Sequence, residues 1–291
     1  MNVKFGNYLD KLKKIKPKRI LLQLPEGLKI RAVDIASEIE KKINAEVIIS
    51  AEPCYGACDL RLDEAKLLGC DLILHFAHSD MGIKSDVPIL YVPVEINIKI
   101  TKKMKEKLKK IKEKKLCIYT SEPFKKVLDE VESYLEKIGK KIVEKKIILG
   151  CSFIKEKGEA NIFVGSGKFH CFALHGKTYF LDLEKSELND VTDLIKKEEM
   201  KKHARIIKFK EAKKIGVLVS KKPGQFYKNF KKIKQKLEDE GKDVTILILD
   251  EITDSKLLGY NFDFYLNTAC PRILDTLSLP VINLNDLFNY A

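Results

Sequence analysis

Short apolar runs alternate along the chain with stretches in which apolar residues recur every three or four positions. The first run, Arg19–Leu24, precedes a stretch with Ile35 and Ile39 on that spacing, and further runs follow at Val47–Ser50 and Leu72–Phe76. Apolar runs of this length predict buried strands, whereas the three-to-four spacing predicts amphipathic helices. Strands that alternate with helices predict parallel sheets with right-handed crossovers, so the expected fold class is α/β.

The same order of predicted elements recurs twice more. In the last third of the chain, strand Lys214–Val219 precedes helix Phe226–Glu240 and strand Val244–Leu249, which repeats the first pass closely. The middle pass is looser and begins with strand Leu116–Tyr119 and helix Phe124–Ile138. The remaining predicted strands are Ile89–Val94, Lys141–Ile148, Asn161–Val164, Thr178–Leu183, Phe262–Leu266 and Leu279–Ile282.

This repetition predicts a chain built from similar units. Lysine-rich stretches near residues 97 and 205 place the boundaries, which gives three α/β domains at 1–97, 98–205 and 206–291. We expect three similar small domains with parallel-sheet βαβ character, arranged around a pseudo-threefold centre.

One cysteine of each predicted domain follows the end of a strand. Cys58 and Cys151 follow the second strand of their domains, and Cys270 follows the third strand of the last domain. Ligands bind at the carboxyl ends of strands in open α/β sheets. Three converging thiolates suit a 4Fe–4S cluster with one iron left open, and zinc is the competing metal. Cys54 lies on the same loop as Cys58, and spacing alone does not choose between them.

The other cysteines are interpreted as core residues, since a cysteine outside a disulfide is among the most buried residue types. Cys70 and Cys117 lie at or within apolar strands, and Cys171 follows a run with the same character. The local CxxxCxxC cluster motif is absent because Arg61 occupies the position of its third cysteine.

The formal net charge of +13 comes mostly from lysine, in runs such as 102–115 and 228–236. Aromatic residues are not interleaved with these runs as in single-strand readers, so we expect solvated helix faces and no direct nucleic-acid binding. No apolar run approaches the roughly 20 residues that span a bilayer, so no membrane partner is expected. The first residues carry no apolar signal segment, which predicts a cytoplasmic protein.

A series of short motifs then gives the chain a specific likeness. In chain order they are Leu24–Leu28 (LPEGL), Tyr55–Asp59 (YGACD), His75–Ser79 (HFAHS), Leu149–Cys151 (LGC), Gly165–His170 (GSGKFH), Ser220–Gln225 (SKKPGQ) and Cys270–Arg272 (CPR). Together and in this order they resemble the archaeal diphthamide synthase family, the 2-(3-amino-3-carboxypropyl)histidine synthases. The resemblance covers nearly the whole chain.

The resemblance implies a non-classical radical S-adenosylmethionine enzyme that acts as a homodimer. Its 4Fe–4S cluster would be held by Cys58, Cys151 and Cys270, one from each domain. With an electron donor, it would transfer the 3-amino-3-carboxypropyl group of S-adenosylmethionine to C2 of a histidine in translation elongation factor 2. Asp80 stands where some relatives carry another cysteine, so no ligand role is carried to that position.

Four residues are candidates for binding S-adenosylmethionine, each with a structural alternative. Arg272 would grip the carboxylate in a bidentate pair, or form an ordinary ion pair. Gln225 would contact the amino acid or nucleoside, or cap its loop. Glu26 would meet the ammonium group, or serve as an acid at a helix N-terminus. His170 would contact substrate or adenosine, or be a hydrogen-bonded structural histidine.

His75 and His78 are three residues apart, so they cannot face the same side of a strand that continues past both. We expect one of them near the mouth of a pocket and the other packed inside. Two other functions compete with the synthase: a dehydrating condensation like that of quinolinate synthase, and a non-catalytic cluster-binding subunit that docks on the translation machinery.

Overall fold

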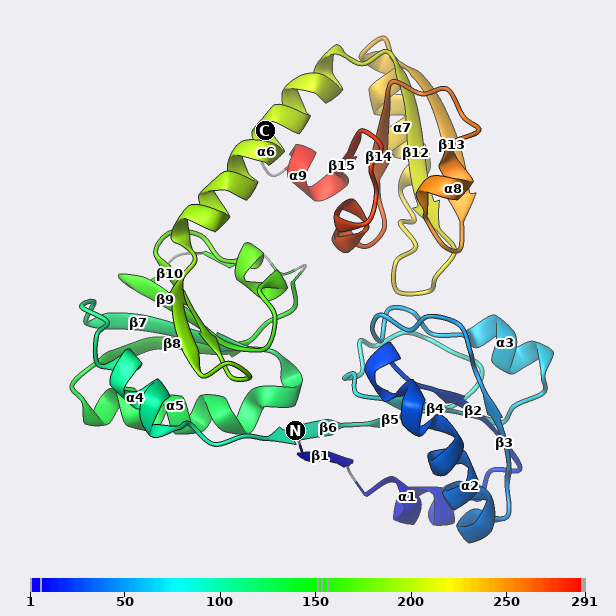
Figure 1. Ribbon diagram of the computed structural model, residues 1–291. Helices are drawn as coiled ribbons and strands as arrows, with labels where there is room; N and C mark the ends of the chain where they lie inside the picture. Colours follow the sequence, from blue (N-terminus) through cyan, green and yellow to red (C-terminus); the bar gives the residue numbers. More distant parts are fainter. Residues whose placement is uncertain (1, 6, 151, 153, 156, 289–291) are drawn as a thin grey trace. The chain divides into compact units, whose positions relative to one another are not determined.

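The computed structural model describes residues 2–5, 7–150, 152, 154–155 and 157–288. In this part of the chain, three sheets of mainly parallel strands are flanked by helices (Figure 1). The predicted α/β fold class is therefore confirmed.

The first sheet has four parallel strands in the order β3-β2-β4-β5. Its strands are β2 (Arg19–Gln23), β3 (Glu46–Ile49), β4 (Leu72–Phe76) and β5 (Ile89–Val92). Its helices are α1 (Tyr8–Ile15), η1 (Glu26–Arg31), α2 (Ala32–Ile43) and α3 (Leu62–Leu67), where η marks a 3₁₀ helix. A separate antiparallel ribbon joins β1 (Asn2–Phe5) to β6 (Val94–Asn97).

The second sheet has five strands in the order β11-β10-β9-β7-β8, with only β11 antiparallel to its neighbour. Its strands are β7 (Lys115–Thr120), β8 (Lys141–Ile147), β9 (Ala160–Gly165), β10 (Thr178–Asp182) and β11 (Glu187–Asp190). Its helices are α4 (Lys102–Leu108), η2 (Glu122–Phe124), α5 (Lys125–Lys137) and η3 (Phe169–Ala173). The long helix α6 (Thr192–Glu211) follows.

The third sheet repeats the order of the first, β13-β12-β14-β15, and is also parallel. Its strands are β12 (Lys214–Ser220), β13 (Asp243–Leu249), β14 (Phe264–Asn267) and β15 (Val281–Asn283). Its helices are α7 (Phe230–Asp239), α8 (Asp254–Leu257), η4 (Pro271–Asp275) and α9 (Leu284–Phe288).

The central strands are mostly apolar, and both faces of each sheet are covered. In the first sheet, Leu22 and Leu74 lie in one buried core with Ile39 of α2, and Leu21 lies in another with Ala65 of α3. Parallel strands buried on both faces read as continuous apolar runs, which is why the sequence pattern located them.

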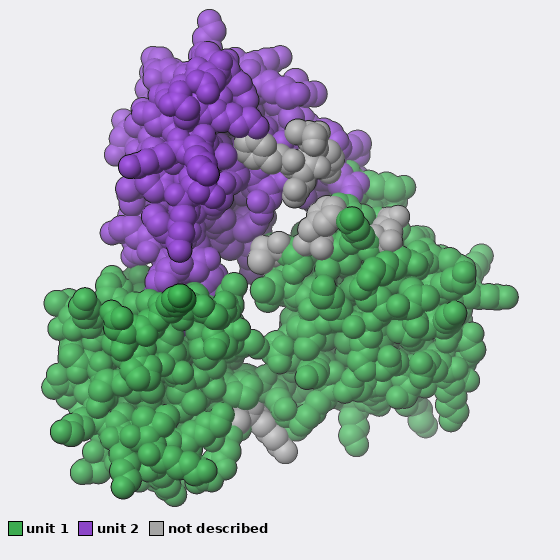
Figure 2. All heavy atoms as spheres, turned by 180° about the vertical axis from the view of Figure 1, so that it is seen from behind, with its two compact units in different colours: residues 1–57, 61–196 green, residues 58–60, 197–291 purple. Residues whose placement is uncertain are grey.

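The chain divides into two compact units (Figure 2). Unit 1 comprises residues 1–57 and 61–196, and unit 2 comprises residues 58–60 and 197–291. The predicted boundary at 97 is the last residue of β6, whereas the one at 205 lies inside α6. The division into three domains and their pseudo-threefold arrangement stay predictions.

Each of the three sheets contains an acidic residue that fixes the start of a neighbouring strand. We call Asp71, Glu159 and Asp263 the strand-start acids. Each lies just before the third strand of its sheet in chain order (β4, β9 or β14), and its carboxylate accepts hydrogen bonds from two backbone N–H groups where the first strand begins. The bonds are Asp71 to Lys18 and Arg19 (2.8 and 3.0 Å), Glu159 to Lys114 and Lys115 (2.7 and 3.4 Å), and Asp263 to Lys213 and Lys214 (2.9 and 2.8 Å).

We expect Asp263→Asn to lower the unfolding temperature near neutral pH and to matter less in acid. The backbone N–H groups of Lys214 and Lys213 hold the pKa of Asp263 below its ordinary value. A carboxyl whose pKa is depressed in the folded state adds stability above its unfolded pKa, and that stability is lost as the pH falls through the folded pKa. Thermal unfolding followed by circular dichroism should therefore give unfolding temperatures for variant and wild type that approach each other as the pH falls below about 4.

Asp243→Asn is the matched control, because Asp243 is an exposed aspartate at the start of the neighbouring strand β13. It is expected to unfold like the wild type at every pH. Equal unfolding temperatures for Asp263→Asn and the wild type at pH 7 would show that the strand-start acid adds nothing.

Candidate functional site

The described cysteines fall into two classes by exposure. Cys58 and Cys270 are half-buried. The buried ones are Cys54, Cys70, Cys117 and Cys171. The last three of these lie in apolar cores, as predicted, and burial raises the pKa of Cys171 to about 12, which keeps it a thiol. Cys151, the third predicted cluster ligand, lies outside the described residues.

Cys58 is held by the loop that follows β12, within unit 2. The backbone N–H of Gly224 donates to the carbonyl oxygen of Cys58 at 3.0 Å. The side-chain amide of Gln225 donates to Cys58 Sγ at 3.5 Å. An N–H group aimed at a cysteine sulfur tunes the potential of a cluster bound there. The structure thus brings together two of the residues selected from the sequence, Cys58 and Gln225.

A buried group of ion pairs holds Asp59, the residue after Cys58. The sequence pattern did not predict this group. Lys222 Nζ lies 2.8 Å from Asp59 Oδ2 and also pairs with Glu251. Burial alone would lower the pKa of Lys222, but its hydrogen bonds to Asp59 and Glu251 outweigh that and raise it. The ammonium group therefore stays charged and offsets the carboxylate of Asp59, whose side chain has no exposed surface.

Two signals for this group were present in the sequence. Asp59 stands directly after the candidate ligand Cys58, and Lys222 lies in the Ser220–Gln225 motif. Asp59 and Lys222 are 163 positions apart, however, and a pairing over that distance cannot be read from a pattern.

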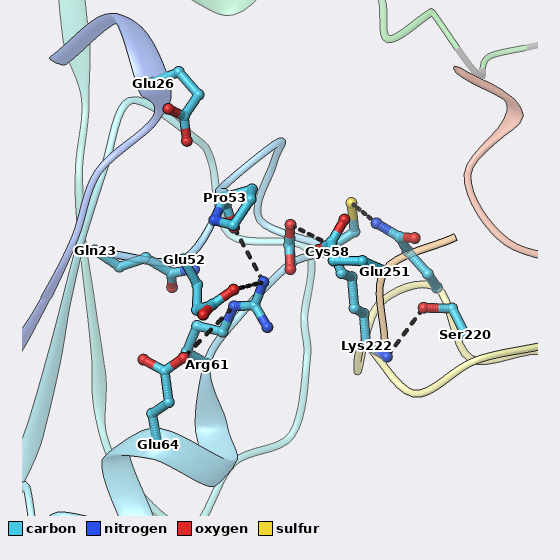
Figure 3. Close-up of polar contacts among 12 residues, drawn as sticks. Gln23, Glu26, Glu52, Pro53, Cys58, Arg61, Glu64, Ser220, Lys222 and Glu251 are labelled. Atoms are coloured by element: carbon cyan, nitrogen blue, oxygen red, sulfur yellow. Dashed lines mark hydrogen bonds and ion pairs between the residues drawn. The ribbon is translucent and has the colours of Figure 1, made fainter. Parts of the chain in front are cut away.

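A second buried charge fixes the part of the loop that belongs to unit 1. Arg61 donates to the carbonyl oxygen of Pro53 at 3.2 Å, and its guanidinium lies 3.9 Å from Glu52 and 4.0 Å from Glu64 (Figure 3). Only 4% of this side chain is exposed. Arg61 thus stabilises the loop from the position where the CxxxCxxC motif would need a cysteine.

Arg272 and Glu26 are exposed and form local ion pairs. Arg272 and Asp275 both lie in η4, which begins directly after Cys270. Arg272 Nε lies 3.8 Å from Asp275 Oδ2. Glu26, at the start of η1, pairs with Lys29 at 2.6 Å. Exposed pairs of this kind add little stability.

His170 lies among aromatic rings on η3. Its ring stacks on Phe163 with centroids 5.3 Å apart and meets the edge of Phe169 at the same distance. Phe169 in turn packs so tightly on Gly150 that a Cβ there would lie 1.7 Å from its ring. A side chain at position 150 would therefore displace the Phe169 ring from this place, whereas glycine leaves room for it.

His75 and His78 contact each other. Their nitrogen atoms His75 Nε2 and His78 Nδ1 are 2.9 Å apart, because β4 ends at Phe76 and Ala77 takes the left-handed conformation (φ 72°), which turns the chain back. His75 is fully buried and His78 half-buried. Burial and the neighbouring His78 lower the pKa of His75 to about 3, and burial lowers that of His78 to about 4, so both rings are neutral at pH 7.

Comparison with known proteins places the chain in a family. The family model for diphthamide synthesis proteins matches residues 24–278. The chain belongs to this family. A 2-(3-amino-3-carboxypropyl)histidine synthase of Pyrococcus horikoshii is 34% identical over 91% of this chain and 82% of that protein. The protein of the same name from Methanocaldococcus jannaschii is 31% identical over 91% of this chain and 81% of its own length.

Solved structures of this diphthamide synthesis family have the same fold. The crystal structure of Dph2 from P. horikoshii matches with a TM-score of 0.88 and 31% identity, over 97% of this chain and 88% of that one. A second crystal structure of that protein, with a 4Fe–4S cluster, also has a TM-score of 0.88, with 32% identity over 96% and 88% of the two chains. The family resemblance inferred from the motifs is confirmed.

No helix in the described ranges is long and apolar enough to cross a bilayer.

Proposed function

We propose that this chain is a 2-(3-amino-3-carboxypropyl)histidine synthase that modifies translation elongation factor 2. It would transfer the 3-amino-3-carboxypropyl group of S-adenosylmethionine to C2 of one histidine, the first step of diphthamide biosynthesis. The observation that carries the proposal is the family match over residues 24–278, with relatives of that name at 34% and 31% identity.

Cys58, Cys151 and Cys270 would hold a 4Fe–4S cluster. Cys58 and Cys270 are the two described cysteines with partly exposed side chains, and Gln225 donates to the sulfur of Cys58, so these two thiols suit cluster ligands. Three thiolates leave one iron without a protein ligand. When bound and reduced, the cluster would supply one electron for cleaving the bond from the sulfonium sulfur to the methionine γ-carbon, which is radical chemistry.

The remaining site residues would position the reactants. The ion pair between Lys222 and Asp59 keeps the backbone beside Cys58 in place. Arg272 and Glu26 would bind the carboxylate and the ammonium group of the methionine part, and His170 would bind the adenosine. Orientation matters here because only the carbon held in line with the electron donor is released.

The partners implied by the proposal are elongation factor 2 as substrate, an electron donor and a second copy of the chain in a homodimer. The expected compartment is the cytoplasm. The excess of lysine gives the surface a positive charge that attracts an acidic partner.

The proposal is tested by a reconstituted reaction. The chain is purified without oxygen, its cluster is reduced, and S-adenosylmethionine is added with elongation factor 2 from the same source. We expect methylthioadenosine together with one aminocarboxypropyl group on one histidine, found by mass spectrometry. The same preparation of elongation factor 2 is also given to a second member of this family under the same conditions. Its modification there shows that the acceptor is competent. If the cluster-loaded chain leaves that acceptor unmodified, the protein is a non-catalytic member of the family.

A further inference from the structure

Three side chains at the end of the first sheet form a group that the proposed reaction does not use. Cys54 lies on the loop after β3, His75 on β4, and His78 directly after the turn at Ala77. One ligand atom from each, the sulfur of Cys54 and a ring nitrogen of each histidine, lies within 4.8 Å of the other two. All three belong to unit 1, and none is among the predicted cluster ligands.

The hydrogen bonds of His75 show which of its nitrogen atoms faces this group. His75 Nδ1 lies 3.1 Å from Oε1 of Gln23, a buried residue directly opposite it on β2. An amide oxygen only accepts, so Nδ1 carries the hydrogen and the lone pair of Nε2 points toward His78. Histidines that bind metals almost always donate their other N–H to a fixed acceptor in this way.

The turn at Ala77 places the second imidazole. In a continued strand His78 would face away from His75, but the left-handed backbone at Ala77 brings the two nitrogen atoms to 2.9 Å. Alanine seldom takes that conformation, which costs about 1 kcal/mol or more, so the surrounding structure enforces the contact between the rings. Because the lone pair of His75 Nε2 points toward His78, the nitrogen atom His78 Nδ1 has to carry the hydrogen between the two rings, unless a cation lies between them and Cys54.

We propose that Cys54, His75 and His78 bind one zinc ion, separate from the iron–sulfur cluster. One thiolate and two neutral imidazoles suit Zn²⁺, which takes sulfur and nitrogen ligands in tetrahedral geometry. Three protein ligands leave the fourth position to water. Cys54 stands four residues before Cys58, so the ion would tie the start of that loop to the end of β4.

Cobalt tests the site, because Co²⁺ takes tetrahedral zinc sites and is coloured. The full chain with Cys58→Ala, Cys151→Ala and Cys270→Ala carries no iron–sulfur absorption that would hide the signal. Adding Co²⁺ should produce thiolate-to-cobalt charge transfer and visible d–d bands that saturate at one ion per chain and disappear when zinc is added. Cys54→Ser in this background should abolish the charge-transfer band, and His78→Gln should weaken binding.

Two further variants make the test specific. Cys70→Ala changes a buried cysteine that lies outside the group, in a core beside the same sheet; it is the matched control and should leave cobalt binding unchanged. Gln23→Leu removes the acceptor behind His75 and should lower zinc affinity about 10- to 100-fold. In the chain with its cluster cysteines intact, Cys54→Ser should lose about one zinc per chain by mass spectrometry and keep its iron.

The proposal is overturned by three results in protein with native circular dichroism. One is the absence of cobalt bands, and another is a charge-transfer band that survives Cys54→Ser. The third is loss of iron and brown colour in Cys54→Ser, which would make Cys54 a ligand of the iron–sulfur cluster. None of these results depends on transferase activity, so the zinc site can fail while the proposed function holds.

Discussion

Cys58→Ala is expected to yield a folded chain without a 4Fe–4S cluster and without transferase activity. Cys58 is half-buried, so its loss opens no large cavity, whereas two remaining thiolates are too few to hold four irons. Brown absorption and bound iron should fall to background in anaerobically purified protein. Methylthioadenosine formation should fall with them to the level of the cluster-free chain.

Cys54→Ala is the matched control for this result, since both cysteines lie on one loop and differ in burial. It should retain the brown colour and the iron. If Cys54→Ala loses the cluster and Cys58→Ala retains it, the ligand assignment is wrong. Retention in both variants would remove this loop from the cluster site altogether.

Lys222→Met is expected to lower the free energy of unfolding more than any other single substitution named above. The substitution leaves the carboxylate of Asp59 buried without its cation, at a side chain with no exposed surface. Removing one partner of a buried ion pair typically lowers the free energy of unfolding by about 3–5 kcal/mol. The free energy of unfolding from denaturant titration should fall by that amount, and iron loading should fall because Asp59 follows Cys58.

Lys221→Met is the neighbouring control, because Lys221 is exposed, and it should change stability by less than about 0.5 kcal/mol. Adding Asp59→Asn to Lys222→Met removes the buried negative charge and should restore part of the loss. If the two lysine variants unfold at the same denaturant concentration, the buried pair does not hold this loop.

The sequence predicted the sheets well because their strands are buried on both faces. Predicted strand Leu72–Phe76 matches β4 residue for residue, and predicted Val244–Leu249 misses β13 by one. The long helix α6 was missed, and the predicted boundary at 205 falls inside it. Its charged residues are frequent and its apolar ones follow no clear helical spacing, so no amphipathic pattern identified it.

The candidate site was only partly predictable. Repetition and motif resemblance selected Cys58, and the structure places Gln225 on its sulfur. Lys222 and Asp59 pair across 163 positions, which no local pattern encodes. The contact between His75 and His78 depends on the backbone conformation of one residue, Ala77, and propensity argues against that conformation for alanine.

The strand-start acids also bear on how the chain folds as it is synthesised. Each of their hydrogen bonds closes a segment of 44 to 53 residues, and every one stays within its own sheet. The entropy cost of closing segments of such similar length is nearly the same, so loop closure does not favour the formation of one sheet over another. Once β5 has left the ribosome, the first sheet has all its strands and its acid, and it is able to form while the rest of the chain is still being made.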